Sequence, residues 1–161
     1  MGGGEAAKRW LENIANDRSR DEGNCQSREF KALEQLALSG IQVLQSETGR
    51  ILCSFVVPKR LADRDGNWHM GAMATVIDDV GAAAIVSIVG WSKSSVDFNI
   101  SYFSTVMIDE EVEIEGRVLG HKGKLSSVIV EVRKKGSGQI VAMGKQWMKT
   151  TFHLARSKSK L

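Results

Sequence analysis

Two adjacent carboxylates, Asp78 and Asp79, interrupt an apolar run that extends from Gly71 to about Val89. Burying an ionised carboxylate without partners costs several kcal/mol, so two acids in such a run need an explanation. Desolvation also raises the pKa of a buried carboxyl group, which makes it a stronger base than a solvated aspartate. The pair is therefore a candidate site of acid–base chemistry. Helix packing, or a contact with a lysine, is the alternative explanation.

The residues just before this run could supply a second kind of group. If a helix begins near Met70 or Gly71, its first backbone N–H groups lack acceptors within the helix and carry the positive end of the helix dipole. Such donors can bind an anion or a developing oxyanion. Asp78 follows Gly71 by two turns on the same face, about 10 Å away along the axis. One carbonyl group could therefore meet both only if one of them came from another chain.

Hydrophobic periodicity predicts the elements that must position these groups. Helical spacing predicts short amphipathic helices over residues 5–16 and 28–38, and one long, nearly apolar helix up to about Val89. Alternation of apolar and polar residues predicts strands over residues 41–47, 51–57, 95–103, 111–119, 125–134 and 139–149. The predicted fold class is α+β, with an antiparallel sheet of about six strands wrapped around one long central helix, and with extra N-terminal helices. Gly81 and the neighbouring alanines should let the helix lie close to the sheet.

Length and composition favour one globular core. The chain has 161 residues, 42% of them hydrophobic and 25% charged, and a formal net charge of +3. We expect an N-terminal helical extension over residues 1–40, a main domain over 41–150 and a polar tail over 151–161. The mild charge argues against a nucleic-acid-binding protein and fits one that handles an anionic small molecule. Two aspartates within the apolar run argue against a membrane span, and the scattered histidines and two cysteines predict no metal site.

The last three residues form a targeting signal. A C-terminal S-K-L, here Ser159 to Leu161, is the address that the peroxisomal import receptor reads. The stretch from Ala155 onward is polar and basic, so it should be exposed. We therefore expect a peroxisomal location with that receptor as a partner, and the cytoplasm as the alternative.

Two stretches carry a resemblance to a known family. H-M-G-A-M-A-T-V-I-D-D-V-G (residues 69–81) and S-V-D-F-N-I-S-Y (residues 95–102) resemble the motifs of hotdog-fold acyl-CoA thioesterases. The similar branch is the phenylacetate-pathway and thioesterase-superfamily-member type, whose usual form is H-G-G-x-x-A-T-L-x-D followed by V-D-x-N-I-x-Y. The resemblance runs from about residue 41 to 149. It implies the hotdog fold, a sheet wrapped on one long helix.

The resemblance also implies catalytic roles. Asp78 would activate the water that attacks the thioester carbonyl, as a general base rather than as a nucleophile. The backbone N–H of Met70, which replaces the first glycine of the motif, would point at the thioester oxygen beside Gly71. His69 would help to hold the carbonyl, and Ser95 would orient the water. The methionine is a departure that places a side chain at the mouth of the site.

Further implications concern the surroundings of the site. Asp63 falls where relatives carry an asparagine, so Asn67 is the nearer candidate for an amide that contacts the substrate. Asp79 is interpreted as a residue of helix packing or of an interface. The family's active sites lie between two subunits of a homodimer or homotetramer, which would answer the distance between the helix start and Asp78. The family uses no cofactor besides the coenzyme A of the substrate.

Five basic residues in or beside two predicted hairpin turns could meet the phosphates of coenzyme A. They are Lys122, Lys124, Arg133, Lys134 and Lys135. An ordinary solvated surface is the alternative for each of them.

The sequence therefore predicts an acyl-CoA thioesterase that acts on a fatty or aromatic acyl-CoA. A non-catalytic acyl-CoA-binding hotdog protein is the alternative, because hotdog domains also sense ligands. A hotdog enoyl-CoA hydratase is disfavoured, because it would need a histidine shortly after Asp78 and the sequence has none there.

Overall fold

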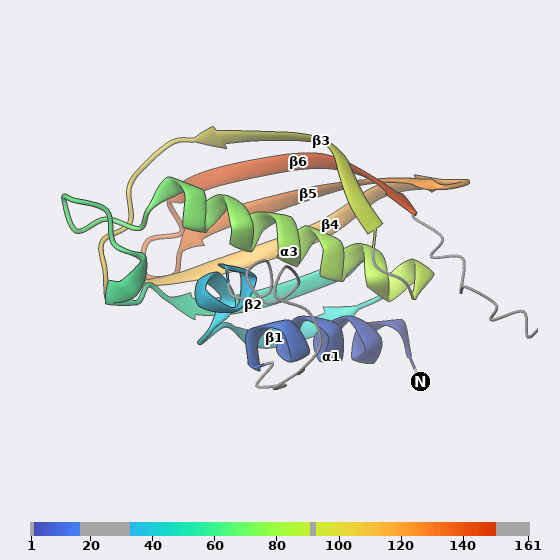
Figure 1. The fold of residues 1–161 in the computed structure, drawn as a ribbon, viewed down its shortest axis with the longest axis horizontal. Coiled ribbons are helices and arrows are strands. Elements are labelled where there is room, and N and C mark those ends of the chain that lie inside the picture. Colours follow the sequence, from blue (N-terminus) through green and yellow to red (C-terminus); the bar gives the residue numbers. More distant parts are fainter. Residues whose placement is uncertain (1, 17–32, 91–92, 151–161) are drawn as a thin grey trace, which may run out of the picture.

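The structure is a computed structural model that describes residues 2–16, 33–90 and 93–150. In chain order the elements are α1 (Gly3–Asn16), a helical segment over residues 33–38, β1 (Gln42–Glu47), β2 (Arg50–Val56), the short 3-10 helix η1 (Lys59–Leu61), α3 (Met70–Val89), β3 (Lys93–Tyr102), β4 (Glu111–Lys122), β5 (Leu125–Lys134) and β6 (Ile140–Thr150). The strands form one antiparallel sheet in the order β1-β2-β4-β5-β6-β3. The α+β prediction of six strands and one long helix is confirmed (Figure 1).

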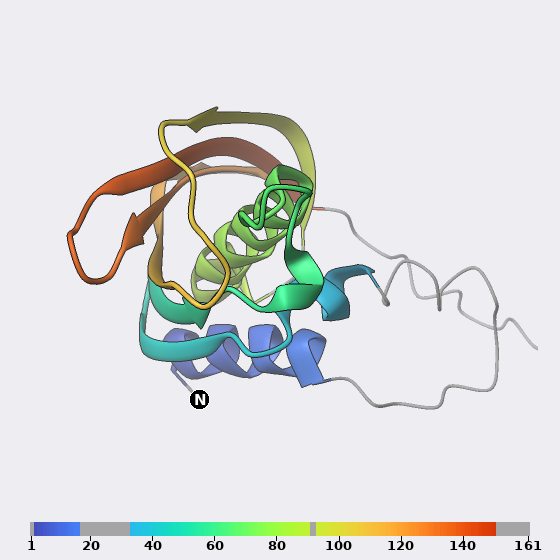
Figure 2. The same ribbon diagram turned by 90° about the vertical axis from the view of Figure 1, so that its left-hand side faces the viewer.

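The sheet curves around α3, as the view along the helix in Figure 2 shows. The helix begins after His69 and ends at Gly90, whose φ of 73° is a left-handed conformation that glycine adopts without strain. The helix is long and apolar enough to cross a membrane by length and composition alone, but 67% of its most apolar window is buried inside the protein. Its apolar residues therefore serve as the core that the sheet encloses.

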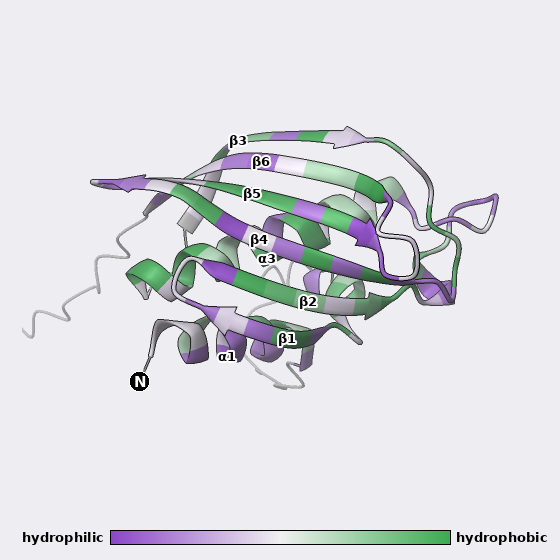
Figure 3. Cartoon of the chain, turned by 180° about the vertical axis from the view of Figure 1, so that it is seen from behind, coloured by the Kyte–Doolittle hydropathy of each residue, from purple (hydrophilic) through white to green (hydrophobic). Residues whose placement is uncertain are grey.

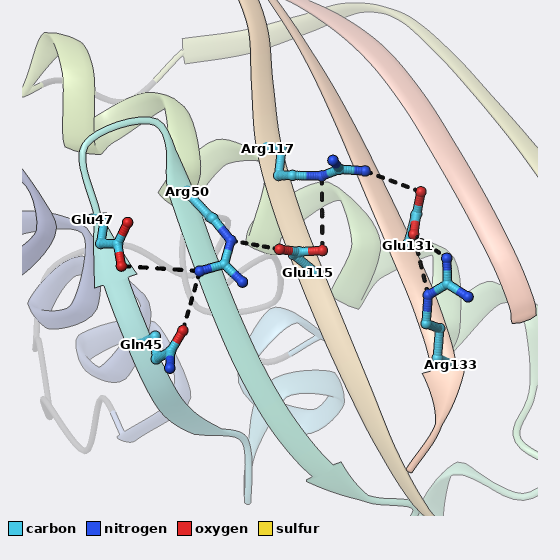
Figure 4. Close-up of polar contacts among 7 residues, drawn as sticks. All are labelled: Gln45, Glu47, Arg50, Glu115, Arg117, Glu131 and Arg133. Carbon is cyan, nitrogen blue, oxygen red and sulfur yellow. Dashed lines mark hydrogen bonds and ion pairs between the residues drawn. The ribbon is translucent and has the colours of Figure 1, made fainter. Parts of the chain in front are cut away.

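The two faces of the sheet differ as the alternation predicts. On β4, Val112 and Ile114 point to the core and are fully buried, while Glu113 and Glu115 lie on the other face. Polar and apolar residues alternate along the strands on the convex side in Figure 3. A ladder of charges crosses this side, in which Arg50 donates to Glu115 at 2.5 Å. Figure 4 shows the ladder, formed by Gln45, Glu47, Arg50, Glu115, Arg117, Glu131 and Arg133.

Strand β3 departs from this pattern because it is an edge strand. Among the described strands its one neighbour is β6, and no described strand pairs with its other edge. Val96 and Phe98 on β3 are 57% and 37% exposed, and Trp147 on the neighbouring strand is 41% exposed. An open edge with exposed apolar side chains is a surface that proteins normally cover.

Three glycines let α3 lie directly against the sheet. A Cβ atom on Gly144 of β6 would lie 2.4 Å from Cγ2 of Ile77, and one on Gly81 of α3 would lie 2.4 Å from Nε2 of Gln146. A Cβ atom on Gly116 of β4 would lie 3.1 Å from the backbone oxygen of Val80. The expectation that Gly81 allows close approach of helix and sheet is confirmed.

The N-terminal helices join the same core. Leu11 and Ala15 of α1 and Ala37 and Leu38 of the segment 33–38 are buried in the cluster that contains the α3 residues. The predicted helix over 5–16 is confirmed, and the predicted helix over 28–38 is confirmed for residues 33–38, whereas 28–32 lie outside the described residues. Helix α1 and the segment 33–38 therefore cover one side of α3, as Figures 1 and 2 show.

Replacing Gly144 with alanine tests the close packing. We expect Gly144→Ala to lower the free energy of unfolding by about 1–3 kcal/mol, because the methyl group overlaps Ile77 in a packed core. Urea unfolding at fixed protein concentration measures this loss. The matched control is Gly136→Ala, where an added Cβ atom meets nothing within 4 Å. Equal effects of the two substitutions would contradict the packing argument.

Candidate active site

His69 caps the start of α3. Its backbone is extended, with φ −61° and ψ 126°, and its Nδ1 atom accepts a hydrogen bond from the N–H of Gly71 at 3.0 Å. A neutral imidazole that accepts at Nδ1 carries its proton on Nε2. This assignment follows from the hydrogen bond. His69 thus holds an N–H donor at the helix start, in the place where the sequence predicts a group that contacts a carbonyl.

The two neighbouring backbone N–H groups have different roles. The N–H of Met70 has no acceptor among the described residues, so it remains a donor for a ligand. The N–H of Gly71 is not available to a ligand, because it donates to the ring of His69. This corrects the expectation that both N–H groups are free. A Cβ atom on Gly71 would lie 3.2 Å from the His69 ring. The glycine therefore lets the ring fold back over the helix start.

Tyr102 at the end of β3 also anchors the helix start. Its hydroxyl donates to the backbone oxygen of Met70 at 3.1 Å, and burial raises the pKa of this phenol. The residue is the last one of the V-D-x-N-I-x-Y motif, yet the sequence analysis gave it no role. The motif itself was the signal that could have found it.

Asp78 lies two turns further along α3, in a polar pocket. The hydroxyl of Ser95 on β3 donates to Oδ1 of Asp78 at 2.7 Å, which brings together two of the predicted residues. The pocket has a volume of about 330 Å³. Its lining comprises Trp10, Ile14, Glu34, Asp78, Asp79, Ala82, Ser94, Ser95 and Met148. The pocket is therefore built jointly by α1, the segment 33–38, α3, β3 and β6.

Burial raises the pKa of Asp78 above the ordinary aspartate value. Hydrogen bonds from Ser95 and from the amide of Gln146 favour the charged form and offset part of this rise. The carboxylate is thus partly desolvated but held by donors. Such a group is a stronger base than a solvated aspartate and still ionises.

Asp79 differs from its neighbour. Its residue is 7% exposed, and its Oδ2 atom has no hydrogen-bond partner among the described residues. Burial, together with the nearby charges of Glu34 and Asp78, raises the pKa of Asp79 to about 8. Asp79 therefore carries a proton at neutral pH, so the two neighbouring aspartates are not both charged. Sequence reasoning missed Glu34, since it lies in the N-terminal extension, outside the motifs.

The helix start opens into a second, separate pocket of about 370 Å³. It contains His69 and Gly71, and its other lining residues are Leu33, Leu36, Ala37, Arg60, Leu61, Ala62, Ala72 and Thr75. It shares no lining residue with the Asp78 pocket. Within one chain, His69 and Asp78 therefore lie in different cavities. Their spacing of two turns along the helix predicts this separation.

Asp63 and Asn67 belong to the loop before the helix. Oδ1 of Asp63 accepts from the backbone N–H groups of Asp65 and Asn67, each at 2.9 Å, and the backbone oxygen of Asn67 accepts from Asp63 at 2.7 Å. The acid therefore closes the loop that leads to His69. Asn67 pairs with Met107 through a β-bridge and lines neither the His69–Gly71 pocket nor the Asp78 pocket.

The five predicted phosphate-binding cations do not form one cluster. Lys122 and Lys124 lie at one end of β5 and the other three at the opposite end, about 30 Å apart for a strand of this length. Arg133 pairs with Glu131 at 2.6 Å, Lys134 with Glu110 at 3.2 Å and Lys135 with Glu111 at 2.7 Å. Each of these three cations thus already has a carboxylate partner, which reduces the charge it offers to a phosphate.

Comparisons with known proteins agree with this arrangement. The model of the family described as "Thioesterase superfamily" matches residues 65–141, a range that contains both motifs. Human acyl-coenzyme A thioesterase 13 is 28% identical over 109 residues, which is 67% of this chain and 78% of the relative.

Solved structures share the fold. Zebrafish thioesterase superfamily member 2 has a TM-score of 0.77 and 24% identity, and the match covers 94% of this chain and 99% of that one. A hypothetical thioesterase from Streptococcus pneumoniae TIGR4, solved with coenzyme A, has a TM-score of 0.66 and 18% identity over 69% of this chain and 88% of that one. The chain therefore has the hotdog fold, and its sequence is similar to members of the thioesterase superfamily.

Proposed function

We propose that the protein hydrolyses a fatty or aromatic acyl-CoA to the free acid and coenzyme A, with Asp78 as general base. The observation that carries this proposal is the pair of Asp78 and Ser95, joined by a hydrogen bond of 2.7 Å inside a polar pocket. The human, orangutan and mouse relatives are each named acyl-coenzyme A thioesterase 13, and the Streptococcus pneumoniae structure contains coenzyme A. Both support this substrate class.

The chemistry follows from the groups in the two pockets. Asp78 accepts a proton from a water molecule that Ser95 orients, and the water oxygen forms a bond to the thioester carbon. The carbonyl oxygen becomes an oxyanion, which the N–H of Met70 and Nε2–H of His69 stabilise. The tetrahedral intermediate then breaks its carbon–sulfur bond. The leaving thiolate takes the proton from Asp78, which restores the base.

The two halves of this site would come from two subunits. The His69 pocket and the Asp78 pocket are separate within one chain, so one carbonyl group cannot reach both. The open edge of β3 and its exposed apolar residues Val96 and Phe98 support a second copy as the partner at this edge. A homodimer about a two-fold axis would create two equal sites, each with the helix start of one protomer and Asp78 of its partner.

Phosphate recognition is proposed for fewer cations than the sequence predicts. Lys122 lies beside the β4–β5 turn and remains a candidate for contacts with coenzyme A, whereas Arg133, Lys134 and Lys135 hold carboxylates of the same sheet. No metal or cofactor besides the substrate is required by the proposed steps.

Asp78→Asn tests the base. We expect the rate of acyl-CoA hydrolysis to fall about 100-fold or more, because an amide cannot accept the proton from water. A panel of fatty and aromatic acyl-CoA substrates, with release of free thiol as the readout, measures the rate and identifies the preferred acyl group. Since Asp78 must be deprotonated, the rate of the unmodified protein should rise with pH through a pKa above the ordinary aspartate range.

The matched control is Asp79→Asn. It replaces a carboxylic acid that is already neutral at pH 7 by a neutral amide of the same shape, so most of the activity should remain. Full activity of Asp78→Asn would show that Asp78 is not the base. Tight binding of acyl-CoA without any release of thiol by the unmodified protein would favour the non-catalytic alternative.

Mixing two impaired variants tests the shared site. We expect Asp78→Asn and His69→Ala to be strongly impaired as separate homodimers. After exchange of subunits, half of the dimers are mixed and each has one intact site, so about a quarter of the normal activity should return. Assay after co-refolding at equal amounts measures the recovery. If activity stays at the level of the separate variants, the site is not shared.

A peroxisomal location stays a prediction based on Ser159, Lys160 and Leu161, which lie outside the described residues. We expect a fluorescent protein fused to the N-terminus to appear in punctate organelles together with a peroxisomal marker. Removal of the three residues should make the fusion diffuse. A diffuse signal with the tail intact would rule out this address.

A further inference from the structure

Gln146 is a buried amide on the apolar inner face of the sheet. It lies on β6 between Gly144 and Met148, which point to the same side, and only 1% of its surface is exposed. The side chain reaches the middle of α3, at the level of Asp78. Its position is therefore between the sheet and the helix turn that carries the proposed base.

The contacts determine the orientation of the amide. Nε2 of Gln146 donates to the backbone oxygen of Asp78 at 3.2 Å and contacts Sδ of Met148 at 3.8 Å. A backbone oxygen can only accept, so the NH₂ end of the amide must face Asp78. The Oε1 atom is buried and has no partner among the described residues.

We propose that Gln146 is a positioning residue that holds Asp78 in place for catalysis. The inference deepens the proposed function, because it concerns the same carboxylate. The amide ties the helix turn of Asp78 to β6, while Ser95 holds the carboxylate from β3. Two neighbouring strands thus hold Asp78 from two directions, β6 at its backbone oxygen and β3 at its carboxylate.

Stability alone does not explain an amide at this position. A buried carbonyl without a donor is unfavourable, and an apolar side chain of the same length would fill the space without that penalty. Residues that lower stability locally are typical of functional sites. The unpaired Oε1 of Gln146 therefore indicates that the amide serves function rather than stability. Asp78 is the polar residue that the amide contacts.

Gly81 provides the space that the Gln146 amide needs beside α3. It lies three residues after Asp78 on α3, and a Cβ atom there would lie 2.4 Å from Nε2 of Gln146. Any side chain at this position would push the amide away from the helix. The glycine in the middle of an otherwise good helix is thus accounted for by the space that the glutamine occupies.

The electrostatics of the pocket agree with this role. Burial raises the pKa of Asp78, and the amide of Gln146 acts against this rise because it favours the charged carboxylate. Among the described residues, the titratable groups near Asp78 are Asp79 on the same helix and Glu34 on the segment 33–38, and burial raises the pKa of each. Both are acids, so within the described part of the chain the donors that favour the charged form of Asp78 are the neutral groups of Ser95 and Gln146.

Gln146→Met is the decisive substitution, because methionine keeps the length and loses the N–H donors. We expect kcat to fall roughly tenfold with KM unchanged, since the lost hydrogen bond acts on the base and not on substrate binding. The acid limb of the pH–rate profile should move up by about one pH unit, because loss of the donor raises the pKa of Asp78. Thermal unfolding should show an equal or higher stability.

A direct titration separates this inference from the proposed function. The carbon-13 signal of the Asp78 carboxyl group, assigned with Asp78→Asn, reports its pKa without any catalysis. The pKa should be higher in Gln146→Met even if another residue proved to be the base. An unchanged pKa together with unchanged kcat would overturn the positioning role, as would a loss of activity that follows the loss of stability alone.

Two further variants complete the test. Gly81→Ala retains the glutamine but displaces its amide, so it should shift the pKa of Asp78 in the same direction, even if Gln146→Met did not fold. The double variant should resemble Gln146→Met alone, because the two changes remove one interaction. Ser127→Ala is the control, since it removes another buried polar group that has no partner in the described structure. It should leave the profile unchanged, and an equal shift would contradict the inference.

Discussion

The direct contact between α3 and the sheet is the constraint on which the rest of the structure depends. Helix and sheet can approach so closely because Gly81, Gly116 and Gly144 present no side chain at the contact. The curved sheet then buries the apolar residues of the helix on one side, and the N-terminal helices cover another side. A bulkier residue at any of the three positions would separate the layers or force a neighbouring side chain to move.

This close packing sets the environment of the two carboxylates. Asp78 and Asp79 are adjacent in sequence, but they differ in burial and in partners. Asp79 is enclosed and keeps its proton at neutral pH, because burial raises its pKa to about 8. Ser95 donates to the carboxylate of Asp78 and Gln146 donates to its backbone oxygen, and both side chains favour the charged form of Asp78. One neutral acid beside one assisted carboxylate avoids repulsion between two buried charges.

The start of the helix has its own geometry. The ring of His69 folds over Gly71 and uses its N–H, while Tyr102 holds the backbone oxygen of Met70. These contacts leave the Met70 N–H and Nε2–H of His69 without acceptors in the described part of the chain. A rigid helix separates these donors from Asp78, which supports the proposal that a second copy of the chain completes the active site. The edge of β3 that no described strand covers is the surface proposed for this copy.

The sequence alone determined the elements, the solvent-exposed and buried faces of the sheet, the helix start near Met70 and the candidacy of Asp78. Periodicity and a charge within an apolar run are local properties of the chain. It did not reveal that Gly71 gives its N–H to the cap, nor that Arg133, Lys134 and Lys135 hold carboxylates of the same sheet. The contact between Gln146 and Asp78 joins residues 68 positions apart. Only the tertiary structure decided it, because the register of β6 and the close approach of the helix bring the amide to the backbone oxygen of Asp78.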